Sequence, residues 1–491
     1  MSLGLPPGPP GRLLVGNLFD LPHDQQHLKF HEWSKEYGHV IHISILGQHI
    51  VVLNSLQAIS DIFETRSAIY SSRSRQPMII ELVGWGWFFA MLPYGEEWRK
   101  GRRAFHQYFN PGAVEEYQPQ LIQAARKSLG RFLADPDEFF AHVRHMVTAL
   151  IMDVAYGIEI SHKDDPYIQV AEVAMASISE SGMPGAFLVN HIPILKYVPV
   201  WFPGAGFQKK AKYWRKVVED MINKPFQNVA DAVRQGTATP SITSAALQGL
   251  PEEMEDTAHE RDTIKYLGGI AYTVSTAHNW FLAMAMYPDV QKRAQAVLDE
   301  VVGTSRLPDF SDRDRLPYIE AMIMETMRWQ VITPLGECVL YGLSFAFPHC
   351  STEDDEYQGY FIPKGSLVFG NAWSILHDPK EYPDPERFNP ERFLEDGRIN
   401  PNVRDPRVAA FGFGRRICPG RFLSDRMMFS LVTSVLSVFD IAPPLDQEDN
   451  PVSLKPALSP GIIGMSAPFK CAIKPRSPAA EDLIRIHSEK P

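Results

Sequence analysis

The stretch AFGFGRRICPGRFL, residues 410–423, places one cysteine in a segment rich in glycine and arginine. This residue, Cys418, is one of only 4 cysteines in the chain. A thiolate is a soft, strong ligand for iron, and it needs surroundings that stabilise the anion without full solvation. Gly412, Gly414 and Gly420 let successive backbone N–H groups point at the sulfur, because no Cβ atom stands in the way. The stretch therefore predicts a thiolate metal ligand, with a buried structural cysteine as the alternative.

Two more residues of this stretch favour an iron porphyrin as the bound group. Arg416 lies close enough in sequence to Cys418 to meet an anionic group on a cofactor. Phe411 is expected to cover the loop. The spacing Phe-x-x-Gly-x-Arg-x-Cys-x-Gly indicates the proximal loop of a haem held by thiolate, with Cys418 as metal ligand and catalytic residue. The five fixed positions would match by chance in a chain of this size with a probability on the order of 10⁻⁴.

Composition and charge narrow the class of protein. The chain has 491 residues, of which 45% are hydrophobic and 22% charged, so the composition is globular and the length alone favours two to three domains. The formal net charge of −10 argues against a nucleic-acid partner, since nothing offsets phosphate repulsion. The 4 cysteines are too few and too scattered for a disulfide framework, which favours a reducing compartment.

The hydrophobic periodicity predicts a helical body with a small sheet. Residues 39–54 alternate and carry a turn at Gly47, which predicts a hairpin. Residues 96–330 are mainly helical, and 288–303 are a clear case, with proline at the start and glycine at the end. Short extended pieces return after residue 330, and a helix over 425–439 follows the cysteine loop. We therefore expect one large helical body and a small sheet built from pieces far apart in sequence.

These features resemble the cytochrome P-450 superfamily along nearly the whole chain. FGFGRRICPG matches its haem-binding signature, ETMR (325–328) its Glu-x-x-Arg motif, and FNPERF (388–393) its Pro-x-Arg-Phe motif. The stretches YPDPERFNPERFLEDG and YVPVWFPGAGF look most like fungal, particularly basidiomycete, members. The resemblance implies a mainly α fold, a large helical domain with a small β-sheet portion. It also implies one haem-binding domain over residues 12–491, in place of the two to three domains that the length alone favours.

The resemblance implies haem b as cofactor and names the residues around it. In the family, residues matching Trp98 and Arg102, four apart on the helix EEWRKGRR (96–103), donate to haem propionates. A solvated basic helix is the alternative for Arg102. A histidine matching His349 reaches a propionate. The expected cofactor-binding residues are Trp98, Arg102, His349, Phe411, Gly412, Arg416, Cys418 and Gly420.

Two motifs are assigned roles other than catalysis. Glu325 and Arg328 lie three apart on one helix face and can pair, while Arg392 can dock on the same carboxylate. In the family this triad braces the wall behind the cysteine loop. The remaining basic residues of segment 96–103 form a patch that we expect to dock an acidic reductase carrying electrons from NADPH, with plain solubility as the alternative.

The sequence departs from the family pattern in two places. In IKYLGGIAYTVSTAHNWFLAM (264–284), the family has an acid followed by threonine, which deliver protons during oxygen activation. Here Ala271 stands at the acid position and Tyr272 at the threonine position, or a gap of about six residues removes the pair, roughly 1.7 helical turns. Residues 337–347 are an apolar insertion between PLG and PH, where the family's substrate-lining loop lies. Real divergence and a gene-model or splice error both account for these differences.

The leading interpretation is a haem-thiolate monooxygenase that inserts one oxygen atom from O₂ into a small lipophilic molecule. The alternatives are a peroxygenase, a dehydratase- or isomerase-like member, or a non-catalytic ligand binder. LPPGPPG makes residues 1–11 resemble the proline-rich hinge behind the membrane anchor of microsomal members, and we expect the anchor itself to be absent here. We expect a monomer on the cytosolic face of the endoplasmic reticulum, with residues 196–212 against the membrane; an ordinary interhelical loop is the alternative.

Overall fold

The structure is a computed structural model. It describes residues 3–22, 25–160, 165–181, 187–249, 274–335, 339–340, 344–345, 348–457 and 466–488, with only the backbone for 339–340 and 344–345. The position of Ala271 and Tyr272 and most of the 337–347 insertion lie outside the described residues. The expectations attached to these segments therefore stay predictions.

Helices make up most of the described chain, which confirms the mainly α class. The α-helices are α1 (Gln26–Tyr37), α2 (Leu56–Ser60), α3 (Ser67–Tyr70), α4 (Glu96–Phe109), α5 (Gln118–Ala134), α6 (Phe139–Tyr156), α7 (Pro166–Ser181), α8 (Gly206–Gln235), α9 (Ile242–Gln248), α11 (Val274–Met286), α12 (Pro288–Val301), α13 (Pro317–Trp329), α14 (Ala372–Leu376), α15 (Arg407–Ala410), α16 (Arg421–Val438) and α17 (Pro478–Ser488).

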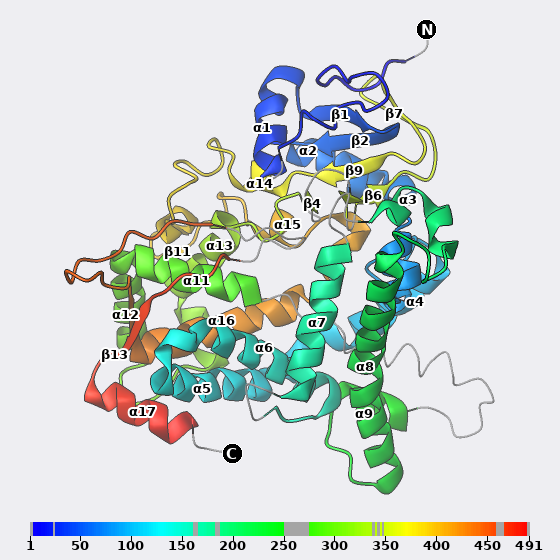
Figure 1. The fold of residues 1–491 in the computed structure, drawn as a ribbon. Helices are drawn as coiled ribbons and strands as arrows, with labels where there is room; N and C mark the ends of the chain where they lie inside the picture. The colour runs from blue at the N-terminus through cyan, green and yellow to red at the C-terminus, as the bar shows by residue number, and fades with distance from the viewer. Residues whose placement is uncertain are drawn as a thin grey trace.

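Within the described residues, the strands are short and fall into one five-stranded sheet and four two-stranded ribbons. They are β1 (Val40–Ile45), β2 (Gln48–Leu53), β3 (Ser72–Arg73), β4 (Val339–Leu340), β5 (Ser344–Phe345), β6 (His349–Cys350), β7 (Asp355–Tyr357), β8 (Tyr360–Ile362), β9 (Leu367–Gly370), β10 (Leu394–Glu395), β11 (Arg398–Ile399), β12 (Phe439–Ala442) and β13 (Ala472–Pro475). Figure 1 shows the larger sheet at the end of the molecule where the N-terminus lies, with the helical body below it.

The five-stranded sheet has the order β1-β2-β9-β6-β3. Strands β1 and β2 form the expected hairpin, with Val40 opposite Leu53 and a turn in which Leu46 and Gly47 have φ of 49° and 84°. Strand β9 pairs in parallel with β2, and β6 joins β9 to β3. The sheet is thus built from segments far apart in the chain, as the sequence predicts.

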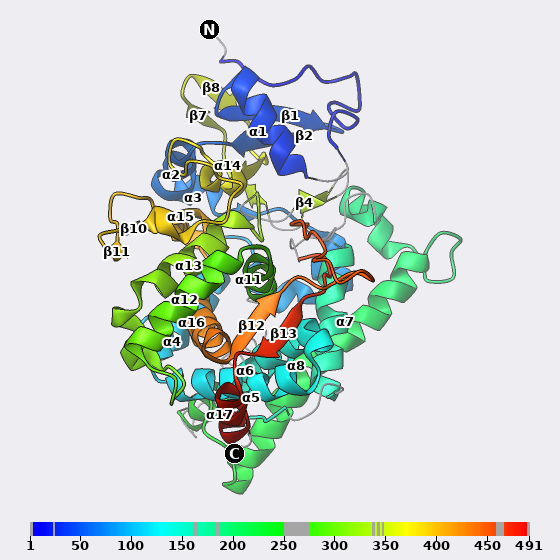
Figure 2. The ribbon, with the colours of Figure 1, turned by 90° about the vertical axis from the view of Figure 1, so that its left-hand side faces the viewer.

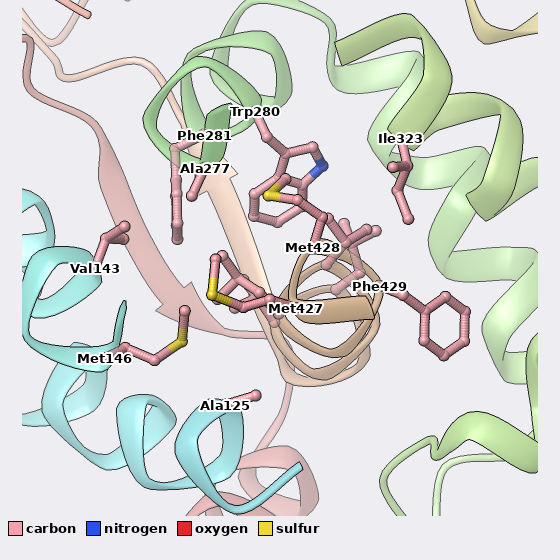
Figure 3. Close-up of a cluster of buried hydrophobic side chains, with 14 of the residues drawn as sticks. Ala125, Val143, Met146, Ala277, Trp280, Phe281, Ile323, Met427, Met428 and Phe429 are labelled. Atoms are coloured by element: carbon pink, nitrogen blue, oxygen red, sulfur yellow. The ribbon is translucent and has the colours of Figure 1, made fainter. Parts of the chain in front are cut away.

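Helix α16 follows the cysteine loop directly and runs through the interior of the helical body (Figure 2). In Figure 3, Met427 points towards Met146 of α6, while Met428 points towards Trp280 of α11. Met427 is only 4% exposed and the other three side chains 2% or less, so they bury large apolar surface around the element that leaves the cysteine loop. The hydrophobic effect thereby anchors one end of that loop.

Two helix boundaries test the sequence-based expectations. Helix α12 begins at Pro288 and ends at Val301, with Gly303 at φ 85° just beyond it, as expected for a glycine in the left-handed conformation that stops a helix. Helix α16 starts at Arg421, earlier than the expected 425, because Gly420 occupies the N-cap and the chain turns helical straight after it.

The proline-rich start of the chain lies against the sheet. The amide of Phe361 donates to the carbonyl of Gly4 and that of His42 to the carbonyl of Pro7, both at 2.9 Å. A Cβ atom on Gly8 would stand 1.9 Å from the His42 carbonyl oxygen, so only glycine allows this approach. No helix within the described ranges is both long enough and apolar enough to cross a bilayer.

Candidate functional site

The cysteine loop is a compact turn between α15 and α16. The amide of Cys418 donates a 2.8 Å hydrogen bond to the carbonyl of Phe411, which closes the loop on itself. Gly414 begins a short 3-10 turn, η10 (Gly414–Arg416), and the amide of Ile417 donates back to its carbonyl at 3.2 Å. Gly412 has φ 77°, a conformation that costs a residue with a side chain about 1–2 kcal/mol. The glycines of the motif therefore let the backbone turn under the thiol.

Glycine is required at position 414 for two reasons, its φ of 57° and a close neighbouring atom. A Cβ atom there would stand 2.1 Å from the carbonyl oxygen of Phe63, in the π-helical segment η1 (Asp61–Thr65). The Phe63 ring also stacks on Phe413 with 6.0 Å between centroids. The sequence pattern alone contained no sign of Phe63, because it lies some 350 residues away and acts through its backbone oxygen.

The surroundings of Cys418 act on the pKa of its thiol in opposite directions. Burial raises its pKa, while the Gly420 amide and the cations Arg102 and Arg421 act to lower it. The net direction is upward, so without a bound metal ion the group is a protonated thiol at neutral pH. A metal ion bound to this sulfur would have to displace the thiol proton. Arg421, which also donates to the Cys418 carbonyl at 3.1 Å, was missed in the sequence although it follows the motif directly.

Helix α4 brings Trp98 and Arg102 to the loop. Nη1 of Arg102 donates a 2.6 Å hydrogen bond to the carbonyl of Ile417, next to Cys418. Trp98 is buried at 5% exposure, and its Nε1 has no hydrogen-bond partner among the described residues. A buried indole N–H without an acceptor is costly, so this atom points to an acceptor supplied by a bound group.

Arg416 joins the loop to the segment before α4. Its guanidinium donates to the carbonyls of Ser71 and Leu92 at 2.7 Å each and of Phe89 at 3.3 Å. The same guanidinium lies over the indole of Trp98, with 4.6 Å to the ring centroid. Arg102, Arg416 and Trp98 therefore converge on one side of the cysteine loop, and the two cations offer charge to an anionic ligand.

His349 lies on β6 and is only 2% exposed. Its Nδ1 is 2.5 Å from the Tyr70 carbonyl, so this nitrogen carries the proton. The imidazole stacks on Phe63 at 4.0 Å, and Phe63 in turn contacts the loop through Gly414. His349 is thus joined to the cysteine loop through one intervening residue.

These residues fit a thiolate-bound haem. The soft sulfur suits iron, and the nearby guanidiniums suit the carboxylates of a porphyrin. The N–H of Trp98 is a buried donor without an acceptor among the described residues, which a bound group could supply. The Gly420 amide hydrogen-bonds the sulfur, and in metal sites generally such a bond tunes the metal-bound sulfur.

The Glu-x-x-Arg motif is structural, as the sequence predicts. Arg328 donates to both Glu325 oxygens, at 2.7 and 2.9 Å, and all three side chains of the triad are nearly fully buried. Nε of Arg392 reaches Glu325 Oε1 at 3.2 Å, and the amide of Asn389 donates to the same oxygen at 2.7 Å. Arg328 further donates to the carbonyl of Leu376 at 3.1 Å, which ties α13 to α14. The triad therefore holds the segments around α13 without touching the thiol.

Comparison with known proteins identifies the family. The cytochrome P-450 family model matches residues 6–465. The cytochrome P-450 monooxygenase COX2 of Coprinopsis cinerea is 43% identical over 99% of this chain and 91% of its own length. The tryptamine 4-monooxygenase of Psilocybe cyanescens is 38% identical over 96% of this chain and 93% of its own. These names favour the monooxygenase over the alternative activities that the sequence left open. The chain belongs to the cytochrome P-450 family and is a haem-thiolate monooxygenase of the basidiomycete type.

Proposed function

We propose that Cys418 is the axial ligand of the haem b that the family carries. The observation that supports this role most strongly is the closed loop, in which the Cys418 amide donates to the Phe411 carbonyl at 2.8 Å and the guanidiniums of Arg102 and Arg421 bond the Ile417 and Cys418 carbonyls. When bound, a thiolate-ligated haem supplies the iron chemistry that transfers one atom of O₂ to a lipophilic substrate and releases the other as water, with electrons from NADPH through a reductase.

The surrounding residues hold the haem in this proposal. Trp98 and Arg102 from α4, Arg416 from the loop and His349 from β6 would donate to the propionates; the Trp98 N–H without a partner supports this for α4, and the stacking of His349 on Phe63 links it to the loop. Phe411, Gly412 and Gly420 would shape the loop that carries the sulfur.

The carbon monoxide difference spectrum of the reduced protein tests the ligand. The wild-type protein is expected to give the thiolate-type band, and Cys418→Ser to lose it while retaining the far-ultraviolet circular dichroism of the folded chain. A Cys418→Ser protein with an unchanged thiolate-type band contradicts the assignment.

Reductase docking is proposed on the basic face of α4. Arg99 and Arg103 are exposed, and Arg99 and Arg415 both lie over the Tyr94 ring, with 5.6 and 5.1 Å to its centroid. Lys100 contributes less, because it pairs with Glu97 at 3.1 Å. These positive charges suit an acidic partner on the side of the molecule that holds the thiolate.

Salt dependence tests this docking surface. Arg99→Glu is expected to slow reduction by the reductase about tenfold at low salt, with the difference shrinking as salt rises. Lys455→Glu, an equal charge change at another exposed position, is the matched control. Equal slowing by both variants, or a rate independent of salt, excludes the docking surface.

Membrane contact is proposed for residues 196–212, with residues 1–11 as the hinge of a monomer on the cytosolic face of the endoplasmic reticulum. Tyr197 and Trp201 are 74% and 80% exposed, an unusual exposure for aromatic side chains, and Lys209 and Lys212 are exposed beside them. Vesicle flotation tests this: Trp201→Ser should reduce binding, and Ile486→Ser, on the exposed face of α17, should not.

A further inference from the structure

Four charged side chains from four elements close into a ring beside the cysteine loop; we call this set the charge ring. Its members are Arg313 of the 3-10 segment η8 (Phe310–Arg315), Glu320 of α13, Arg407 of α15 and Asp425 of α16. Arg313 Nη2 lies 2.7 Å from Glu320 Oε2 and 2.6 Å from Asp425 Oδ2. Arg407 Nη2 lies 2.7 Å from Asp425 Oδ1 and also bonds Glu320 Oε1. Each carboxylate therefore bridges both guanidiniums, and each guanidinium bridges both carboxylates.

The charge ring brackets Cys418 in the sequence. Arg407 opens the short helix α15, which ends at Ala410 just before the loop begins. Asp425 lies near the start of α16, the helix that follows the loop. The bond between Arg407 and Asp425 thus joins the entry of the loop to its exit. The contacts with Glu320 fasten both to α13, which carries the buried Glu325–Arg328 pair.

The charge ring restricts the relative positions of its four side chains. Its four side chains are between 19% and 28% exposed, so water screens their attraction only in part. A planar guanidinium that meets two carboxylates is restricted in direction as well as distance. Burial alone would lower the pKa of Arg407, but attraction by Asp425 and Glu320 outweighs it and raises the pKa. Arg313 is further seated over the Phe429 ring of α16, at 5.0 Å from its centroid.

We propose that the charge ring is a positioning device for the thiolate: it fixes the separation of α15 and α16 so that Cys418 keeps its sulfur on the haem iron. The proposal rests on the proposed role of Cys418 as axial ligand. None of the four residues touches the thiol, so they act through the backbone at the two ends of the loop. Loss of the ring is expected to let the sulfur leave the iron while the rest of the fold persists.

The test compares two Asp→Asn variants in the holoenzyme. Asp425→Asn removes one corner of the ring with little change in volume. Asp299→Asn is the control, because Asp299 on α12, 34% exposed, forms a partly buried ion pair with Arg476, at 2.5 Å. The measured quantity is the rate at which the thiolate-type band of the reduced, carbon monoxide-bound protein converts to the band of a non-thiolate ligand on warming. We expect about a tenfold faster conversion for Asp425→Asn than for Asp299→Asn, at equal loss of circular dichroism.

The possible outcomes distinguish a positioning role of the charge ring from a general effect on stability and from an error in the ligand assignment. Equal conversion rates for the two variants, or conversion that follows unfolding, overturn the charge ring as a positioning device. If Asp425→Asn yields no folded holoenzyme, Arg407→Lys replaces it, since lysine keeps the charge but cannot bridge both carboxylates, and the same comparison decides. If the thiolate-type band survives Cys418→Ser, the ligand assignment is wrong and the positioning role of the charge ring is overturned with it. If Cys418→Ser abolishes the band but the two Asp→Asn variants convert at equal rates, only the positioning role is overturned.

Discussion

Arg102 donates from Nη1 to the carbonyl oxygen of Ile417 at 2.6 Å, across 315 positions of the chain. This hydrogen bond joins helix α4 to the residue that precedes Cys418. It places a guanidinium close enough to the thiol to act against the upward shift of its pKa that burial causes. One side chain therefore contributes to the position of the loop and to the electrostatics of its sulfur.

Replacing Arg102 should weaken haem retention. Arg102→Gln removes a charged hydrogen bond worth about 1.5–3 kcal/mol, so haem should pass to a scavenger apoprotein roughly ten to a hundred times faster. Arg103→Gln, at the exposed neighbouring position on α4, should leave the rate unchanged. Equal rates for both variants would contradict the role of Arg102.

Gly414→Ala should destabilise the protein far beyond the cost of its backbone conformation. The added Cβ meets the Phe63 carbonyl oxygen at 2.1 Å, whereas Gly359, at φ 79°, has nothing within 4 Å of a Cβ. Gly359→Ala should lower the free energy of unfolding by about 1 kcal/mol, and Gly414→Ala by several times that or prevent haem binding. Denaturant unfolding measures both; a similar loss at the two positions would refute the clash.

Glu325→Gln should cost about 3–5 kcal/mol in the free energy of unfolding, because it leaves the buried guanidinium of Arg328 without its counter-charge. Glu481→Gln is the control, since Glu481 pairs with Arg485 at the exposed surface of α17, and there the loss should stay within about 0.5 kcal/mol. Urea unfolding followed by tryptophan fluorescence compares the two. A loss below 1 kcal/mol for Glu325→Gln would show that the triad is not a stabilising element.

Acid should destabilise the fold through buried histidines. His377 is stacked on Trp373 at 4.3 Å, and burial, aided by the charge of Arg328, lowers its pKa from 6.5 to about 3. Between these two values the unfolded chain binds a proton that the folded chain does not, so stability falls as the pH falls from 6.5 towards 3, by about 1.4 kcal/mol per pH unit. His377→Gln should reduce the slope of unfolding free energy against pH by that amount, and an unchanged slope would disprove the contribution.

Several features follow from residues close together in the sequence. The cysteine motif, the hairpin around Gly47 and the helix from Pro288 to Val301 depend on local backbone preferences: glycine where φ is positive, proline at a first helical turn, and apolar spacing. The Glu325–Arg328 pair is local too, because three residues on a helix bring the side chains together. For these elements the printed sequence was sufficient.

Only the tertiary structure decided which distant groups meet the loop. Phe63 behind Gly414, the carbonyls that hold Arg416, and the closing of Arg313, Glu320, Arg407 and Asp425 into a ring all depend on the packing of separate helices. No periodicity encodes these contacts, since each partner is an ordinary charged residue or a backbone oxygen until the hydrophobic core brings its element into place. The amino-acid order thus determined the chemistry of the sulfur loop, and the burial of α13 and α16 determined what surrounds it.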